Sequence, residues 1–383
     1  MALHFSEEEL LSRRRRVIDD LNAQGFDGLL IFKQESMFYL TGYDSFGYCF
    51  FQALYLGCDG RFFLMTRAPD LRQAQNTSVI EDIRVWVDRD GHNPASELRQ
   101  ILSEYGVAKK RIGVEMQAYG LSAAHWVQLS SALAGFCTLT DASDVVNQRR
   151  MVKSDTEIAY VRTAAKLADE ALDEAQELTH AGAFEGDILA AMQGRIFAGG
   201  GDYPANEFIV GSGDDALLCR YFTGRRHLSP VDQITLEFAG SYRRYHAALM
   251  RTLLVGQPHP EHVSMYAACA DAMQACVETV KPGNTMGDVF LAHAKTLDAA
   301  GMQAHRLNAC GYSLGATYTP TWMDGGMFFE GNSTVIETNM VLFIHIILMN
   351  SPANRAQTLG QTVRVTDNGC ELLSERPLEM ITG

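Results

Sequence analysis

Residues 234–256 read Ile234-Thr-Leu-Glu-Phe-Ala-Gly-Ser-Tyr-Arg-Arg-Tyr-His-Ala-Ala-Leu-Met-Arg-Thr-Leu-Leu-Val-Gly256. Apolar and polar residues alternate near a central Gly-Ser-Tyr-Arg-Arg segment, and this alternation is typical of a β-hairpin. We expect strands over residues 234–239 and 245–255, joined by a turn over residues 240–244. Glu237, Arg244, His246 and Arg251 lie among strand-forming residues, where such side chains need a partner or a function.

The bulk composition is that of a globular protein. The 383 residues leave room for two domains, with 47% hydrophobic and 20% charged residues. The net charge of −14 argues against a nucleic acid or an anionic membrane as partner. The one basic run, 13–16, follows acidic residues and leucines, so we expect it to form a solvated helix face.

The eight cysteines form no regular spacing, which is typical of a protein from a reducing compartment. No apolar run reaches the roughly 20 residues that span a bilayer. The first residues are acidic and lack an apolar signal core. We therefore expect a soluble, cytoplasmic protein.

The first part of the chain alternates strand and helix patterns, which predicts an α/β domain with a mixed sheet. Strands are expected at 28–32, 48–56, 61–66, 80–87 and 111–115, and helices at 6–25, 36–42 and 94–105. A hinge is expected over 141–153. Ser154-Asp-Thr-Glu157 has the form of a capping box and predicts the start of a long helix.

The second part shows two helices, the hairpin, two more helices and further strands. The helices are expected at 184–198, 261–280 and 286–300 in addition to the capped one, and the later strands at 340–348 and 361–366. This order repeats roughly once, which predicts an internally duplicated α+β domain.

The order of several short motifs resembles that of the creatinase/aminopeptidase P superfamily, the M24 or pita-bread family. They are residues 36–43 (Ser-Met-Phe-Tyr-Leu-Thr-Gly-Tyr), 152–158 (Val-Lys-Ser-Asp-Thr-Glu-Ile), 208–213, 245–252, 281–285 and 310–315. The resemblance implies a two-domain α+β/α/β fold. A creatinase-like N-terminal α/β domain would occupy 1–147. A pita-bread catalytic domain, a duplicated α+β unit with a curved antiparallel sheet, would occupy 148–383.

The metallopeptidases of this family bind two divalent metals through two aspartates, a histidine and two glutamates. The resemblance places these positions at Glu237, Ala248, Tyr312, His345 and Gly360, with Gln361 as the neighbour if the last is displaced by one residue. Alanine and glycine carry no ligand, and a neutral phenol is a poor one. We therefore expect no metal site and no cofactor.

The superfamily also has non-metal branches, creatinase and the ectoine hydrolases, which hydrolyse C–N bonds of small polar substrates. The details here are more similar to the ectoine hydrolases, among them residues 39–44, 236–246, 311–322 and 343–345. One departure is Ile346-Ile-Leu-Met349, where a Met-Pro-Gly-like turn is expected. The substrate is therefore not fixed as ectoine.

Four residues are candidates for the chemistry. Metal-free hydrolysis needs a base for water and a donor for the developing charge. Glu237 is the first candidate, either as the base or as the group that binds a cationic substrate such as an amidinium, with a structural ion pair to Arg244 or Arg251 as the alternative. His345 and His246 are further acid or base candidates, each with a core role as the alternative. Tyr312 is a candidate donor to an oxyanion.

The substrate would be held by other residues. Arg220 stands where the resemblance places a histidine, and a guanidinium suits a substrate carboxylate. Trp322 and Tyr318 are candidate pocket walls. The resemblance to creatinase implies a homodimer in which Phe46, Tyr48 and Phe50 cover the partner's pocket, although packing in their own domain is equally open. Cys219 as nucleophile, or a Cys/His zinc site with Cys310, are weaker alternatives.

The sequence therefore predicts a metal-independent hydrolase of a non-peptide C–N bond. Its substrate would be a small carboxylated amidine, guanidine or cyclic amide. The alternatives are an Xaa-Pro aminopeptidase or dipeptidase with an atypical metal site, a non-catalytic binding protein on the same fold, and a lyase acting on an osmolyte.

Overall fold

The computed structural model describes residues 3–220 and 224–383. The chain divides into two compact units, residues 1–150 and 151–383. In the described ranges, no helix combines the length and the apolar character needed to cross a membrane.

The first unit is an α/β domain around a six-stranded mixed sheet of order β4-β3-β2-β1-β5-β6. β1 pairs antiparallel with β2 and parallel with β5, so the prediction of a mixed sheet is confirmed. The strands are β1 (Gly28–Ile31), β2 (Ala53–Gly57), β3 (Phe62–Arg67), β4 (Ile83–Trp86), β5 (Arg111–Val114) and β6 (Thr138–Asp141). The helices are α1 (Glu7–Ala23), α2 (Gln34–Thr41), α3 (Ala68–Thr77), α4 (Pro94–Glu104), α5 (Ala123–Leu133) and α6 (Ser143–Met151).

The boundary between the units, at residues 150 and 151, falls within the hinge expected over 141–153, most of which forms the helix α6. Two local predictions in this unit are wrong. The strand expected from residue 48 begins only at Ala53, because Gly47–Cys49 forms a 3₁₀ turn first. Arg13 is buried rather than solvated, because its guanidinium lies between the rings of Phe5 and Tyr39, 3.9 and 4.4 Å from their centroids.

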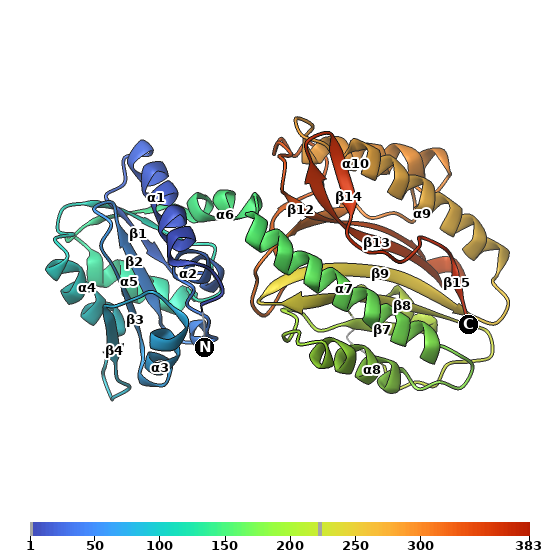
Figure 1. Ribbon diagram of the computed structural model, residues 1–383, viewed down its shortest axis with the longest axis horizontal. Coiled ribbons are helices and arrows are strands. Elements are labelled where there is room, and N and C mark those ends of the chain that lie inside the picture. The colour runs from blue at the N-terminus through green and yellow to red at the C-terminus, as the bar shows by residue number, and fades with distance from the viewer. Residues whose placement is uncertain (1–2, 221–223) are drawn as a thin grey trace. The chain divides into compact units, whose positions relative to one another are not determined.

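The second unit is built on a nine-stranded sheet with the path β11-β10-β12-β13-β9-β8-β7, whose strands pair antiparallel. Off this path, β14 pairs antiparallel with β13, and β15 pairs parallel with β9. Figure 1 shows its long strands curving between the pair α7 and α8 and the pair α9 and α10. The helices are α7 (Asp155–Leu178), α8 (Glu185–Ala198), α9 (Pro260–Thr279) and α10 (Met286–Ala299). The strands are β7 (Ile209–Ser212), β8 (Asp232–Tyr242), β9 (Tyr245–Val255), β10 (Gly311–Leu314), β11 (Met323–Met327), β12 (Val341–Asn350), β13 (Arg355–Thr366), β14 (Gly369–Leu372) and β15 (Ile381–Thr382). Short 3₁₀ turns, η2 (Gly213–Leu217) and η3 (Ser351–Ala353), follow β7 and β12.

The hairpin β8–β9 is confirmed, but its turn is shorter than expected. Arg243 and Arg244 are the two turn residues, with positive φ angles of 50° and 70°. Such angles suit a tight hairpin but are uncommon outside glycine and asparagine. Outside contacts stabilise them: Arg244 N–H donates to Asp202 Oδ2 at 2.9 Å, and the Arg243 guanidinium donates to Tyr160 Oη at 2.7 Å.

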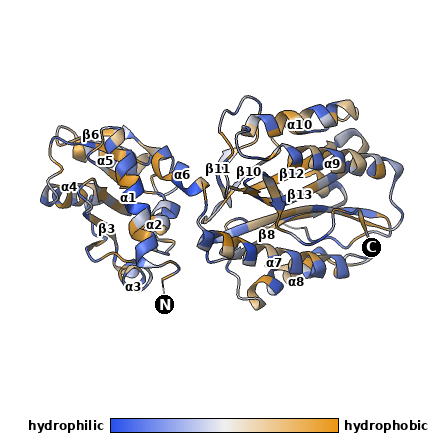
Figure 2. Cartoon of the chain, turned by 45° about the horizontal axis from the view of Figure 1, so that its top comes forward, coloured by the Kyte–Doolittle hydropathy of each residue, from blue (hydrophilic) through white to orange (hydrophobic). Residues whose placement is uncertain are grey.

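The two faces of the sheet have different environments. Leu342, Ile344 and Ile346 of β12 belong to an apolar core that includes residues of α9 and α10. Figure 2 shows the long strands largely in the hydrophobic colour and these helices in mixed colours. Successive side chains alternate between faces, so Phe343 and His345 point to the opposite, inner face.

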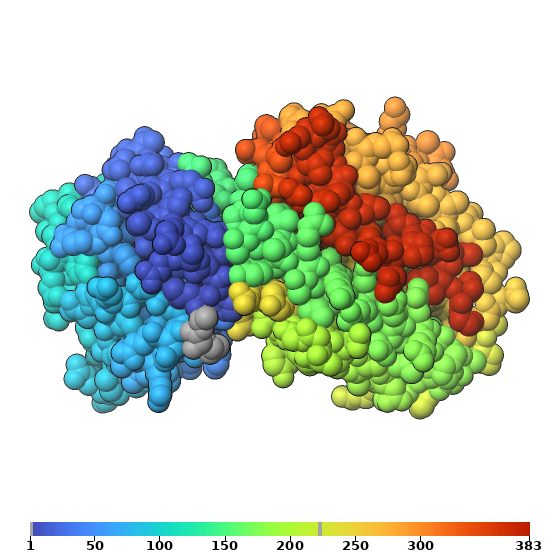
Figure 3. Space-filling view, viewed as in Figure 1, coloured from blue at the N-terminus to red at the C-terminus, as the bar shows by residue number. Residues whose placement is uncertain are grey.

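The C-terminal segment packs over the helices of the second unit. Arg376 pairs with Asp173 of α7, and Tyr266 of α9 donates to the carbonyl of Leu378. Figure 3 shows this segment, in red, lying beside the green residues of α7 and the gold residues of α9. These contacts join the two helix pairs on one surface.

Candidate active site

The strand register places one row of residues side by side on the inner face of the sheet. Glu237 of β8 faces Met250 of β9, Met250 faces Gly360 of β13, and Gly360 faces His345 of β12. Directly opposed residues in antiparallel strands share a face. The row therefore brings Glu237 and His345, both predicted from sequence, to the same surface.

A chain of hydrogen bonds crosses this surface. The Trp322 Nε1–H donates to Tyr312 Oη at 2.8 Å, and the Tyr312 hydroxyl donates to Glu237 Oε1 at 3.2 Å. Tryptophan can only donate through its indole nitrogen, which fixes the direction of the first bond, and the Tyr312 hydroxyl is then free to donate to the Glu237 carboxylate.

A cavity of about 170 Å³ opens beside this chain. Five of the predicted site residues line it: Glu237, Tyr312, His345, Arg220 and Trp322. Cys219, the weaker candidate for a nucleophile, also lines it, and the wall residues that the sequence did not indicate include Asn206, Leu307 and Thr321. The cavity lies wholly within residues 151–383, so one unit supplies all of these walls.

Burial determines the protonation states of the ionisable side chains that line the cavity. It raises the pKa of Glu237 to about 7, against the opposing effects of the Tyr312 hydrogen bond and the Arg220 charge. Burial, with the nearby His293 and Arg220, lowers the pKa of His345 to about 3. Burial and the Glu237 charge raise the pKa of Tyr312 well above its usual value. Near neutral pH, His345 and Tyr312 are therefore uncharged, and Glu237 is the group that titrates.

His246 does not line the cavity. The alternation of β9 places it on the inner face as predicted, but its Nε2 accepts from Ala205 N–H at 3.0 Å. Its Nδ1 lies 3.1 Å from Thr317 Oγ1, so both nitrogens have protein partners. Burial lowers its pKa to about 4. These contacts favour the core role that the sequence left open for His246, and a catalytic role stays a prediction.

Tyr318 is also absent from the cavity wall. Its ring is buried and lies 5.1 Å from the Arg244 guanidinium. Phe46, Tyr48 and Phe50 belong to the first unit, where the Arg67 guanidinium lies 4.0 Å from the Phe50 ring centroid. Phe46 is 74% exposed. A role for these aromatics over a partner's pocket stays a prediction.

Comparison with known proteins identifies the family. Residues 159–368 match the model of metallopeptidase family M24, and residues 13–152 match the creatinase/prolidase N-terminal domain. The chain therefore belongs to the M24 family, a family of hydrolases, and the prediction of the pita-bread fold with a creatinase-like N-terminal domain is confirmed.

Particular relatives cover nearly the whole chain. An uncharacterized hydrolase/peptidase, y4tM, from Sinorhizobium fredii is 30% identical over 99% of this chain and 98% of its own length. The ectoine hydrolase of Halomonas elongata is 27% identical, with the same coverage. The structure of an Xaa-Pro dipeptidase from Bacillus anthracis superposes with a TM-score of 0.85 at 20% identity, covering 98% of this chain and 100% of that one. This last likeness concerns the fold alone.

The residues present do not fit the dinuclear metal centre that the family implies. A Cβ on Gly360 would lie 2.6 Å from both the Met250 Cβ and the Phe343 ring, so apolar groups occupy the place of a ligand side chain. Ala248 offers no donor, and Tyr312 is a neutral phenol. Within residues 3–220 and 224–383, no group of three or more His, Cys, Asp or Glu could hold a metal ion.

The weaker cysteine alternatives also lack support. Burial and the Glu237 charge raise the pKa of Cys219, which disfavours a thiolate nucleophile. Sequence reasoning missed Met250 and Phe343 because strand register, rather than a motif, places them beside Gly360.

Proposed function

We propose that this chain is a metal-independent hydrolase of a non-peptide C–N bond. Its substrate would be a small carboxylated amidine, guanidine or cyclic amide. The observation that carries the proposal is Glu237, a carboxyl with a pKa of about 7 that Tyr312 holds at the edge of a cavity of about 170 Å³. A base with a pKa near the working pH is well matched to general-base catalysis.

In the proposed reaction, the carboxylate of Glu237 removes a proton from water as the water oxygen attacks the sp² carbon of the substrate. As Glu237 takes up that proton, the Tyr312 O–H turns from Glu237 Oε1 to the substrate heteroatom that gains negative charge. Glu237 then returns the proton to the leaving nitrogen as the C–N bond breaks. His345, with a pKa of about 3, is too weak a base for the first step, so its neutral imidazole serves to hydrogen-bond water or substrate.

Arg220 is assigned to the substrate carboxylate. It lines the same cavity and is exposed, so its guanidinium can offer paired N–H donors to an incoming anion. The small volume of the cavity favours a compact substrate over a peptide. A homodimer with the N-terminal domain near the partner's site remains part of the proposal.

Two alternatives have specific support. Several relatives, such as the Xaa-Pro dipeptidase of Pyrococcus horikoshii, are named as peptidases, which favours an atypical peptidase. The apolar Met250 and Phe343 on the inner face favour a binding protein without catalysis. Residues Ile346–Met349, where the resemblance places a Met-Pro-Gly-like turn, continue the strand β12 without a turn.

A substrate panel tests the proposal. Purified protein is incubated with ectoine, creatine, other guanidino acids and Xaa-Pro dipeptides, and the products are identified by NMR and mass spectrometry. Hydrolysis of a non-peptide C–N bond, lost in Glu237→Gln, is the expected result. Cleavage of the Xaa-Pro dipeptides alone would establish a peptidase, and turnover of none with tight binding of one would establish a binding protein.

A further inference from the structure

A second pocket of about 350 Å³ lies in the same unit, and its wall shares no residue with the Glu237 cavity. The starts of β8 and β13, the end of β9 and the segment leading into α9 surround it. Val231, Leu254 and Pro258 form an apolar side, whereas Arg226, His259 and Arg355 contribute polar groups. The volume is within the range of small-molecule sites.

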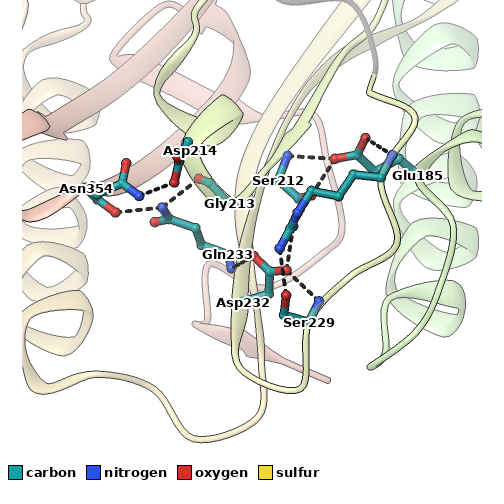
Figure 4. A network of polar contacts seen from close by, with 9 residues as sticks. Glu185, Ser212, Gly213, Asp214, Ser229, Asp232, Gln233 and Asn354 are labelled. Atoms are coloured by element: carbon teal, nitrogen blue, oxygen red, sulfur yellow. Dashed lines mark hydrogen bonds and ion pairs between the residues drawn. The ribbon is translucent and has the colours of Figure 1, made fainter.

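The acceptor groups of this pocket are already engaged. Asp232 Oδ2 accepts from Ser229 N–H at 2.7 Å and from the Arg226 guanidinium at 2.6 Å, and Oδ1 accepts from Gln233 N–H at 2.9 Å. Figure 4 shows Asp232 beside Ser229, and Gln233 between Gly213 and Asn354. Both oxygens of the carboxylate therefore already accept hydrogen bonds, and Oδ2 accepts two.

The Gln233 side chain is saturated as well. Its Nε2 donates to the carbonyls of Gly213 and Asn354, each at 2.9 Å. Its Oε1 accepts from Ala356 N–H at 2.9 Å and from His262 Nε2–H at 2.9 Å. Burial, with the Arg355 charge, lowers the pKa of His262 to about 4, so the imidazole stays neutral near pH 7.

In contrast to these engaged groups, the pocket keeps hydrogen-bond donors that a ligand could use. His259 Nδ1 accepts from Arg355 Nε–H at 3.1 Å and from Glu261 N–H at 3.2 Å, so the proton of its neutral ring is on Nε2. Arg355 Nη1 donates to the carbonyl of Ala353, and Arg355 Nε forms an ion pair with Glu261 Oε2 at 3.3 Å. Across the described ranges, Arg355 Nη2 and His259 Nε2 have no hydrogen-bond partner. The pocket therefore offers donors without matching acceptors.

We propose that this pocket is a second binding site, for a small organic anion. A carboxylate or phosphate head would accept hydrogen bonds from Arg355 Nη2 and His259 Nε2, and a short apolar body would pack on Leu254 and Val231. The ordered network around Asp232 and Gln233 holds the pocket floor in place before binding, which lowers the entropic cost of recognition.

Calorimetric titration with three probes tests this site. Benzoate and phenyl phosphate represent the two anionic heads, and benzamide is a neutral molecule of similar size. We expect saturable binding of at least one anion and none of benzamide. We expect Arg355→Gln to weaken the anion at least tenfold, and Arg162→Gln, which removes an exposed arginine paired with Glu371 elsewhere, to leave it unchanged.

A second variant guards against misfolding of the first. Val231 is 67% exposed at the pocket wall, so Val231→Glu adds a carboxylate without removing a core contact, and it should weaken the anion by a similar factor. Equal affinity in the parent protein and Val231→Glu, equal binding of benzamide, or no saturable binding of either anion would overturn the proposal.

Discussion

Substitution of Glu237 by glutamine should stabilise the protein while it abolishes turnover. The pKa of Glu237 is about 7 in the folded protein, against an ordinary value of 4.5. Below pH 4.5 the carboxyl is protonated in both the folded and the unfolded chain and contributes nothing. Above that pH the unfolded chain ionises first, so the buried carboxyl lowers the free energy of unfolding increasingly until pH rises past about 7.

The size of the effect follows from that gap. Each unit of difference between the folded and the unfolded pKa corresponds to about 1.4 kcal/mol in the free energy of unfolding. The expected gain in Glu237→Gln is therefore about 1 kcal/mol at pH 5.5 and about 3 kcal/mol at pH 8. Glutamine keeps an oxygen that can accept from the Tyr312 hydroxyl, so the hydrogen bond is retained.

Hydrogen-exchange mass spectrometry on peptides from β8 and β9, measured across a urea series, reads the stability of the second unit separately from the first. Glu177→Gln, at an exposed carboxyl of α7, is the matched control and should change stability by less than about 0.5 kcal/mol at either pH. Equal stability of Glu237→Gln and the parent protein at pH 8 would refute the claim that Glu237 is destabilised by burial.

Three further outcomes are expected. If Glu237 is the base, kcat/KM rises with pH and levels off above an apparent pKa of about 7, whereas a pH-independent rate from 5 to 9 would assign the base elsewhere. Trp322→Phe removes the donor to Tyr312 Oη and should lower kcat about tenfold with little change in KM. Trp126→Phe, in the other unit, is the control. An unchanged kcat in Trp322→Phe would show that the hydrogen bond does not assist the reaction. Gln361→Glu places a carboxylate beside the buried Arg251, whose Nη2 donates to Gln361 Oε1 at 3.2 Å, and should raise the free energy of unfolding by about 1–3 kcal/mol at pH 7. A loss of stability on thermal unfolding would contradict that pairing.

Local patterns in the sequence predicted the elements well where a single physical signal dominated. The capping box at Ser154 and Glu157 starts α7 as expected, and the alternation of 234–256 gives the hairpin. The restriction of the expected turn to Arg243 and Arg244 could not be foreseen, because contacts from Asp202 and Tyr160, distant in sequence, stabilise its positive φ angles.

Only part of the site could be predicted from the sequence, because contacts between segments distant in the chain decide the rest. Motif order brought Glu237, Tyr312, His345, Arg220 and Trp322 to one cavity. His246 lies on the predicted face of β9, but both of its ring nitrogens hydrogen-bond within the protein, to Ala205 N–H and to Thr317 Oγ1. No local sequence pattern reveals such partners. Burial also raises the pKa of Glu237 and lowers that of His345, and the extent of burial at each residue depends on the assembled sheet.

Turnover by metal-depleted protein shows whether the hydrolysis needs a metal ion. The substrate that the panel identifies is offered to chelator-treated protein, whose metal content is determined by elemental analysis. We expect undiminished hydrolysis at far less than one metal ion per chain and no gain on adding Mn²⁺, Co²⁺ or Zn²⁺. Activity that disappears with the metal and returns with it would show that the hydrolase is metal-dependent.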